Sequence, residues 1–178
     1  MKKLIIIMLF CLSIVGYGSF AQSNTSGGGY GNTLNLGLGI GGYSGYYGYT
    51  NRSITVFHLD YEFDVARNFT LAPFVNFYSF RGDHYRESVI PIGVKGSLYL
   101  DEILKANSAW DFYLAGSLGF ALVNSRWDND YNGNKDYYVR PRPLFLDLHV
   151  GAEYHLSQKV GIFLDLSTGV STIGLAIH

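Results

Sequence analysis

The chain contains one cysteine, Cys11, and it falls within an apolar N-terminal stretch that we expect to be removed on export. A lipoprotein cleavage at this residue would place bulky Phe10 directly before it and leave a very short apolar segment, so no lipid anchor is expected there. The mature chain would then have no cysteine. Disulfide bonds and thiol chemistry are therefore excluded.

The first 21 residues have the three parts of a secretory signal peptide. Lys2 and Lys3 supply the positive start, residues 4–15 the apolar segment, and residues 19–21 (Ser-Phe-Ala) a small-x-small cleavage site. A transmembrane anchor is the alternative, but the apolar run is too short to span a bilayer. We predict a signal peptide at 1–21, a flexible Gly/Ser-rich lead at 22–31, and one domain at 32–178.

Charge is scarce. Charged residues make up 15% of the chain, while there are 15 tyrosines and 12 phenylalanines. Soluble domains are typically about one quarter charged, and a soluble domain this poor in charge could hardly cover its surface. Without Lys2 and Lys3, the 13 basic residues fall to 11 against 14 acidic ones, with no basic patch. A nucleic-acid partner is therefore not expected.

Long apolar runs are also missing from the mature chain, which excludes a transmembrane helix. Apolar residues instead alternate with polar ones, as in the stretch 144–156, which reads LFLDLHVGAEYHL. A strand has a side-chain period of two, so this stretch has one apolar and one polar face. An apolar surface without a spanning helix leaves a closed β-barrel as the membrane-spanning solution.

Eight stretches show this alternation, and a short helical turn is expected at 101–108. The predicted strands are 32–41, 52–63, 69–80, 88–100, 110–123, 144–156, 160–168 and 170–178. Pro73 cannot donate to a strand ladder, so we expect a bulge there. The connections 42–51, 81–87 and 124–142 are longer than 64–68 and 157–159, an asymmetry typical of bacterial outer-membrane barrels whose short turns face the periplasm. The sequence thus predicts an all-β, eight-stranded, antiparallel up-and-down transmembrane β-barrel, acting as a monomer.

The same alternation also fits a soluble lipocalin-like barrel with its apolar face inward. The polar face distinguishes the two. It carries mostly Gly, Ala, Ser, Thr and Asn with a few carboxylates, whereas a water-facing exterior would carry many Lys and Glu residues. Small residues and isolated charges are typical of a narrow, packed lumen.

Residues 92–99 (IGVKGSLY), 151–155 (GAEYH) and 169–177 resemble segments of the small outer-membrane barrels of Gram-negative bacteria, the OmpX and OmpA membrane-domain type of the "outer membrane protein beta-barrel" family. This resemblance implies an outer-membrane location. Such families include structural proteins, adhesins, narrow porin-like pores and a few lipid-modifying enzymes, so the resemblance implies no single activity. These barrels usually end in an aromatic residue, whereas this sequence ends in His178.

The inward faces are expected to gather a polar network around one main basic residue, Lys95. Its other members are the carboxylates Asp60, Glu62, Asp111, Asp147, Glu153 and Asp165, together with His58, His149 and His155. Because eight strands leave room for little more than side chains, we expect a closed plug, with a cation-preferring pore as the alternative. The i, i+2 pairs of Asp147, His149, Glu153 and His155 could chelate a metal, but a four-coordinate zinc needs further converging ligands, and none is predicted.

Asp128, Asp130 and Asn132 match the start of a calcium loop, although Val139 stands where a bidentate Glu is needed, so this candidate is weak. No nucleophile elbow, phosphate loop or zinc-protease motif is present, and no catalytic residue, enzyme activity or cofactor is predicted. We predict an outer-membrane barrel with a closed lumen and a structural or surface-interaction role through its outer loops, contacting membrane lipid and possible extracellular ligands. The alternatives are a narrow passive pore, a lipid-modifying enzyme and a lipocalin-like ligand binder.

Overall fold

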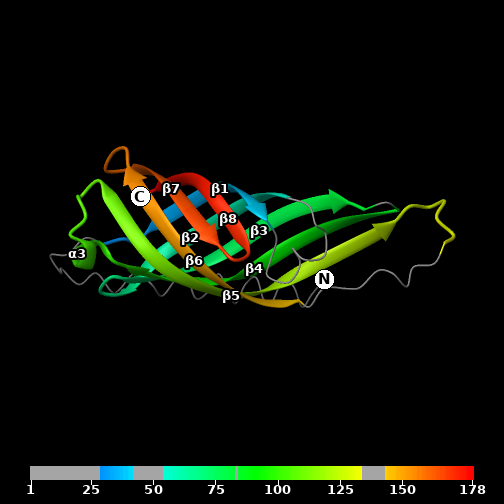
Figure 1. Ribbon diagram of the computed structural model, residues 1–178, viewed down its shortest axis with the longest axis horizontal. Coiled ribbons are helices and arrows are strands. Elements are labelled where there is room, and N and C mark those ends of the chain that lie inside the picture. The colour runs from blue at the N-terminus through cyan, green and yellow to red at the C-terminus, as the bar shows by residue number, and fades with distance from the viewer. Residues whose placement is uncertain (1–28, 42–53, 83, 134–142) are drawn as a thin grey trace.

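The computed structural model describes residues 29–41, 54–82, 84–133 and 143–178. The predicted signal peptide, the loop 42–51 and residues 134–142 lie outside them. Eight strands and one helical turn make up the described chain (Figure 1). They are β1 (Thr33–Gly41), β2 (Thr55–Ala66), β3 (Phe69–Arg81), β4 (Tyr85–Tyr99), α3 (Asp101–Leu104), β5 (Trp110–Trp127), β6 (Leu144–His155), β7 (Val160–Ser167) and β8 (Val170–Ile177).

Each strand pairs antiparallel with its sequence neighbours, and β1 pairs with β8 to close the barrel. The pairing can be followed around the barrel from Leu36 in either direction. Through β2, β3 and β4 it reaches Phe120 on β5, and through β8, β7 and β6 it reaches Trp110 on the same strand, ten residues away. This stagger of ten residues means that the strands tilt by roughly 40° from the barrel axis. The predicted eight-stranded up-and-down barrel is confirmed.

The strands β4 and β5 are longer than predicted. The interval 81–87 was expected to be a loop, but β3 runs to Arg81, β4 begins at Tyr85 and β5 continues to Trp127. Apolar alternation stops near Ile90 and Leu122, yet the backbone stays paired up to Tyr85 and Trp127. These ends of β3, β4 and β5, together with the residues that follow or connect them, form what we call the extension (residues 78–82, 84–89 and 123–133). It reaches far beyond the β7–β8 hairpin (Figure 1).

Pro73 lies within β3 without the predicted bulge. The pairs Asp60–Phe74 and Phe63–Leu71 on either side of it keep the same register between β2 and β3. The register shift instead falls between Asp64 and Ala66, next to the β2–β3 turn. The expectation of a bulge at Pro73 was therefore wrong, and the irregularity lies where the strand ends.

Apolar side chains point outward and polar side chains point into the lumen. Leu118, Leu146 and Ile173 are more than half exposed, whereas Asp60 and Lys95 are at most 4% exposed. A barrel whose outer surface is leucine, isoleucine and phenylalanine is suited to lipid and not to water. The lipocalin-like alternative, which needs the opposite arrangement, is wrong. Among the described residues, no helix has the length and apolar character needed to span a membrane.

The lumen is filled in layers. Towards the extension, an apolar cluster includes Val56, Phe74, Val89 and Phe145. The opposite end, where the β2–β3, β4–β5 and β6–β7 connections lie, is called the turn end here, and there Tyr99 and Tyr113 pack together with Tyr30. Most of the buried charges occupy the space between these two layers and the turn end itself, and Glu87 is buried within the extension, where Ser125 donates to it at 3.0 Å. Side chains thus fill the interior, as expected for eight strands.

Candidate functional site

Lys95 stands at the middle of the lumen between two aspartates. Its Nζ lies 3.1 Å from Asp60 Oδ2 and 3.6 Å from Asp165 Oδ2, and it also lies over the Tyr113 ring at 5.6 Å. Lys95 is the one lysine or arginine that is buried among the described residues. Because a buried charge is costly unless paired, the ammonium and the two carboxylates stabilise one another.

Each of these aspartates is held by a histidine. His58 contacts Asp60 Oδ2 through Nε2 at 2.8 Å and Asn76 Oδ1 through Nδ1 at 2.6 Å. On the opposite wall, His149 donates from Nδ1 to Asp165 Oδ1 at 2.7 Å. We call Lys95, Asp60, Asp165, His58 and His149 the central cluster. It connects strands β2, β4, β6 and β7 across the lumen, so it ties the barrel walls together.

Ser117, His149 and Asp165 make the contacts of a catalytic triad. Ser117 Oγ lies 2.9 Å from His149 Nε2, opposite the Nδ1 contact to Asp165. Ser117 is only 4% exposed, and the cavity beside it has a volume of about 20 Å³, which is room for a single water. Since β5 is paired on both sides, the backbone N–H groups near Ser117 are used in the sheet and cannot form an oxyanion hole.

Glu62 lies deeper towards the turn end and is held by hydroxyl groups. Tyr99 donates to Glu62 Oε1 at 2.8 Å, Thr70 donates a second, short hydrogen bond to the same oxygen, and Asn35 contacts Oε2 at 3.5 Å. Asn35 also donates to Asp60 Oδ1 at 2.8 Å. Glu62 is thereby joined to the central cluster through one amide.

The other predicted lumen carboxylates lie apart from Lys95. Asp147 accepts a hydrogen bond from Thr168 at 3.1 Å near the β7–β8 turn. Glu153 and Asp111 lie at the turn end with His155 and His178, and we call these four residues the turn-end cluster. The structure therefore divides the expected single network into a central cluster, a turn-end cluster, and Asp147 near the β7–β8 turn.

Two residues that contact these clusters were not assigned to the network from the sequence: Ser117, which contacts His149, and His178, which contacts Glu153. His178 continues the inward-facing alternation of Thr172, Gly174 and Ala176 along β8 and past its end. That alternation was a usable signal. What it could not show is that β8 ends two strands away from Glu153 in the closed barrel, with only β7 between them.

The first described residues are fixed at the turn end. Tyr30 stacks on Tyr99 with ring centroids 3.9 Å apart, and the backbone amides of Tyr30 and Gly31 donate to Asp64 Oδ1. Burial and the nearby Asp101 carboxylate raise the pKa of Tyr30 to about 12, so its phenol stays neutral. Tyr30 therefore adds a neutral, aromatic lid to this end of the lumen.

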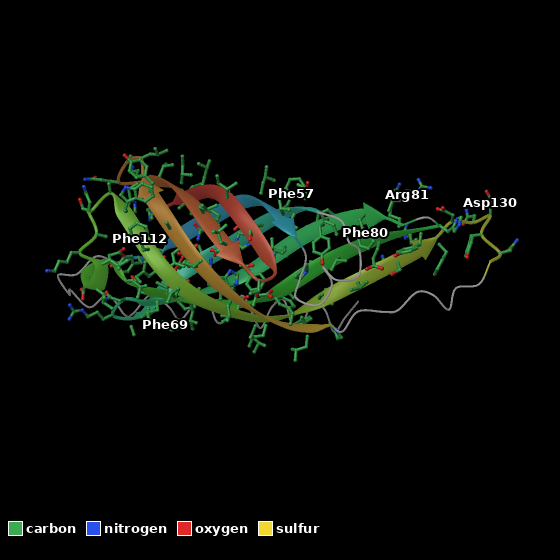
Figure 2. The ribbon with its side chains drawn as sticks, viewed as in Figure 1. Phe57, Phe69, Phe80, Arg81, Phe112 and Asp130 are labelled. Carbon is green, nitrogen blue, oxygen red and sulfur yellow. The ribbon has the colours of Figure 1, made fainter. Side chains whose placement is uncertain are left out.

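The calcium-loop candidates lie at the tip of the extension. Asp128 forms an ion pair with Arg81 at 3.4 Å, and Arg81 and Asp130 lie near the far end of the molecule (Figure 2). Asn132 is the last of the three, and Val139 lies outside the described residues. Calcium binding there stays a prediction.

The barrel is similar to solved structures of other proteins. No family model and no curated protein matches the chain. The crystal structure of Neisserial surface protein A (NspA) matches with a TM-score of 0.58 and 14% sequence identity, covering 84% of this chain and 98% of NspA. The fold is that of the small eight-stranded outer-membrane β-barrels.

Two further structures match this chain with lower TM-scores. The outer-membrane protein Ail of Yersinia pestis, in a phospholipid bilayer nanodisc, has a TM-score of 0.47 and 11% identity over 83% of this chain and 98% of Ail. A de novo designed transmembrane β-barrel has a TM-score of 0.44 and 12% identity, over 83% of this chain and 95% of the design. At these identities the likeness to small outer-membrane barrels concerns the fold alone.

Proposed function

We propose that this protein is an outer-membrane barrel that neither conducts nor catalyses, and that acts at the cell surface through its extension. The observation that carries the proposal is the closed lumen beneath an extended sheet. The central cluster crosses the lumen, and the cavity beside it holds about 20 Å³. A pore needs a continuous water path, and a volume of one water does not supply it.

The outward face of β5 supports a membrane position. It is apolar from Trp110 to Leu122, a length of about 40 Å along the strand. With strands tilted by roughly 40°, this corresponds to a band about 30 Å high, which equals the hydrocarbon thickness of a bilayer. The extension begins where this band ends, and we place it on the outer side because the short turns lie at the opposite end.

The outward face of the extension becomes more polar with distance from the apolar band, as seen in the rows of outward residues that pair across β3, β4 and β5. The first row beyond the apolar band is Ser79, Ser88 and Asn124, and the next is Arg81, Arg86 and Arg126. We call these three arginines the arginine row. They stand directly opposite one another on β3, β4 and β5. Arg81 already pairs with Asp128 at 3.4 Å, and the like charges of Arg86 and Arg126 in opposite positions are destabilising unless an anion lies near them.

A hollow of about 300 Å³ lies in this region, lined by Arg86, Ser88, Asn124 and Arg126. Guanidinium groups bind phosphate through paired hydrogen bonds, and this row would lie at the level of the outer-leaflet headgroups. We therefore propose that the arginine row contacts phosphate groups of outer-leaflet lipid and anchors the extension at the surface.

Planar-bilayer recording of the purified protein tests the closed lumen. We expect no steady channels from preparations whose unboiled gel mobility differs from the boiled one, because that shift shows a folded barrel. Steady single-channel currents from the same folded fraction would contradict the proposal and favour the narrow pore.

The arginine row is tested with the Arg86→Gln/Arg126→Gln variant in vesicles of phosphatidylcholine with or without anionic lipopolysaccharide. We expect lipopolysaccharide to raise the temperature at which the wild-type barrel unfolds, and to raise it less in the variant, because two phosphate-binding groups are missing. The Lys105→Gln/Lys159→Gln variant, which removes equal charge from the turn end, is the matched control and should keep the wild-type response. An equal response in the arginine variant would contradict the lipid contact.

A further inference from the structure

Three side chains of the turn-end cluster converge on one point. Glu153 Oε1 lies 2.8 Å from His178 Nε2 and 3.6 Å from His155 Nδ1. The three atoms all lie within 4.8 Å of one another. The side chains are mostly sheltered, with exposed fractions of 8% for Glu153, 24% for His155 and 21% for His178. Donor atoms bound tetrahedrally to one zinc lie about 3.3 Å apart, so small rotations would bring this set into a coordination sphere.

In each histidine, the ring nitrogen that points away from Glu153 already has a hydrogen-bond partner. His155 Nε2 donates to Asp111 Oδ2 at 2.8 Å, because the carboxylate can only accept. Thr33 Oγ1 donates its single hydrogen to the Tyr30 carbonyl at 3.1 Å, so it accepts from His178 Nδ1 at 2.9 Å. In their neutral forms, these tautomers leave His155 Nδ1 and His178 Nε2 with lone pairs directed at the Glu153 carboxylate.

Two lone pairs and a carboxylate oxygen that face one another repel unless a cation stands between them. In the described part of the chain, the ion-pair contacts of Glu153 are with His155 and His178, and neither is a lysine or arginine. Protons on His155 Nδ1 and His178 Nε2 would satisfy these contacts only by charging both rings. A metal ion would satisfy all three, and the partners of the far nitrogens are the outer hydrogen bonds that orient histidine ligands in metal sites.

The backbone makes room for this arrangement. Glu153 is on β6 and His178 follows β8, so the carboxylate must reach across β7. It does so over Gly161, where an added Cβ would lie 2.0 Å from Glu153 Oε1. Any side chain at position 161 would occupy the place of the carboxylate. The glycine is thus needed for Glu153 to meet His178.

We propose that Glu153, His155 and His178 form a binding site for a divalent transition-metal ion, with Zn²⁺ as the ion that fits the donor set. Two imidazoles and one carboxylate are a common zinc ligand set that leaves the fourth position to water. The hard cations Mg²⁺ and Ca²⁺ prefer oxygen ligands and do not suit a site with two nitrogen donors. A bound ion would link the ends of β6 and β8 and, through Thr33, the start of β1.

The test is calorimetric titration of Zn²⁺ into the untagged, folded protein in detergent micelles, since a polyhistidine tag would itself bind zinc. We expect one Zn²⁺ per chain with micromolar or tighter affinity, and no measurable heat with Mg²⁺. His155→Ala and His178→Ala should each weaken binding at least 100-fold. Asp111→Asn removes only an orienting partner and should weaken it about 10- to 100-fold.

His84→Ala is the matched control, because His84 is an exposed histidine at the other end of the molecule, stacked on Tyr131. It should bind zinc as the wild type does. Boiled and unboiled gel mobility verifies that each variant is folded. Co²⁺ provides a second readout, since its visible absorption is strong in tetrahedral sites and should vanish in His178→Ala. No zinc binding at millimolar concentration, or binding that survives in both histidine variants, would overturn the proposal.

Discussion

The central cluster and the turn-end cluster are built from the same residue types but differ in their charge balance. In the centre, two carboxylates and two histidines surround Lys95, whose ammonium neutralises the carboxylates from within the chain. At the turn end, two carboxylates and two histidines meet without a lysine or arginine among their described ion-pair partners. The comparison teaches that the first cluster is complete as it stands, whereas the second has a place for a cation from outside.

The largest effect is expected from removing the internal cation. Lys95→Met leaves Asp60 and Asp165 buried without their ammonium and should lower the free energy of unfolding by about 3–5 kcal/mol. Urea unfolding followed by the gel mobility of unboiled samples measures it. The Lys95→Met/Asp165→Asn variant should recover part of the loss, because one unpaired charge is gone. An unchanged urea midpoint in Lys95→Met would mean that the cluster does not stabilise the barrel.

An intermediate effect is expected at Gly161. Gly161→Ala should displace the Glu153 carboxylate and weaken zinc binding about 10- to 100-fold, while the central cluster and its stability are unchanged. Gly116→Ala is the control, since the nearest atom to its Cβ, the Asp147 carbonyl oxygen, is 3.9 Å away. Calorimetric titration of zinc into both variants measures whether the change affects the turn-end cluster alone. Equal zinc affinities would show that the position of Glu153 does not matter.

No effect is expected when Ser117 is probed as a nucleophile. A fluorophosphonate should leave the folded protein unlabelled, because the cavity beside Ser117 has the volume of one water and the backbone N–H groups near Ser117 are used in the sheet. Mass spectrometry of the treated protein measures this. Labelling that disappears in Ser117→Ala and in His149→Ala would instead assign an enzymatic role to the central cluster.

Period-two alternation was sufficient to predict the barrel, because lipid on one side and a packed lumen on the other constrain every second residue. The same signal fails beyond Ile90 and Leu122, because the outward face of the extension carries Ser, Asn and Arg in place of leucine and isoleucine, so apolar residues no longer alternate with polar ones. Residues 81–87 were therefore read as a loop, although their backbone is largely paired.

The polar lumen residues could be assigned to one face but not to partners. Alternation places Lys95 and Glu153 inside, but it does not show how far along the barrel axis each residue lies. The strands are tilted, and their register shifts by ten residues over one full circuit of the barrel. For this reason Glu153 was grouped with Lys95, and His178, which lies against it, was considered only as an unusual ending.

The unequal strand lengths also bear on the surrounding lipid. The strands β7 and β8 have 8 residues each, whereas β4 has 15 and β5 has 18, and the β7–β8 hairpin ends far short of the extension (Figure 1). The apolar outward face runs from Val160 to Leu166 on β7 but from Trp110 to Leu122 on β5, so the apolar wall is lower on one side of the barrel than on the other. A bilayer adapts to a short apolar wall by thinning beside it. The membrane around this protein should be thinner next to β7 and β8, so the bilayer should be locally perturbed on one side of the barrel.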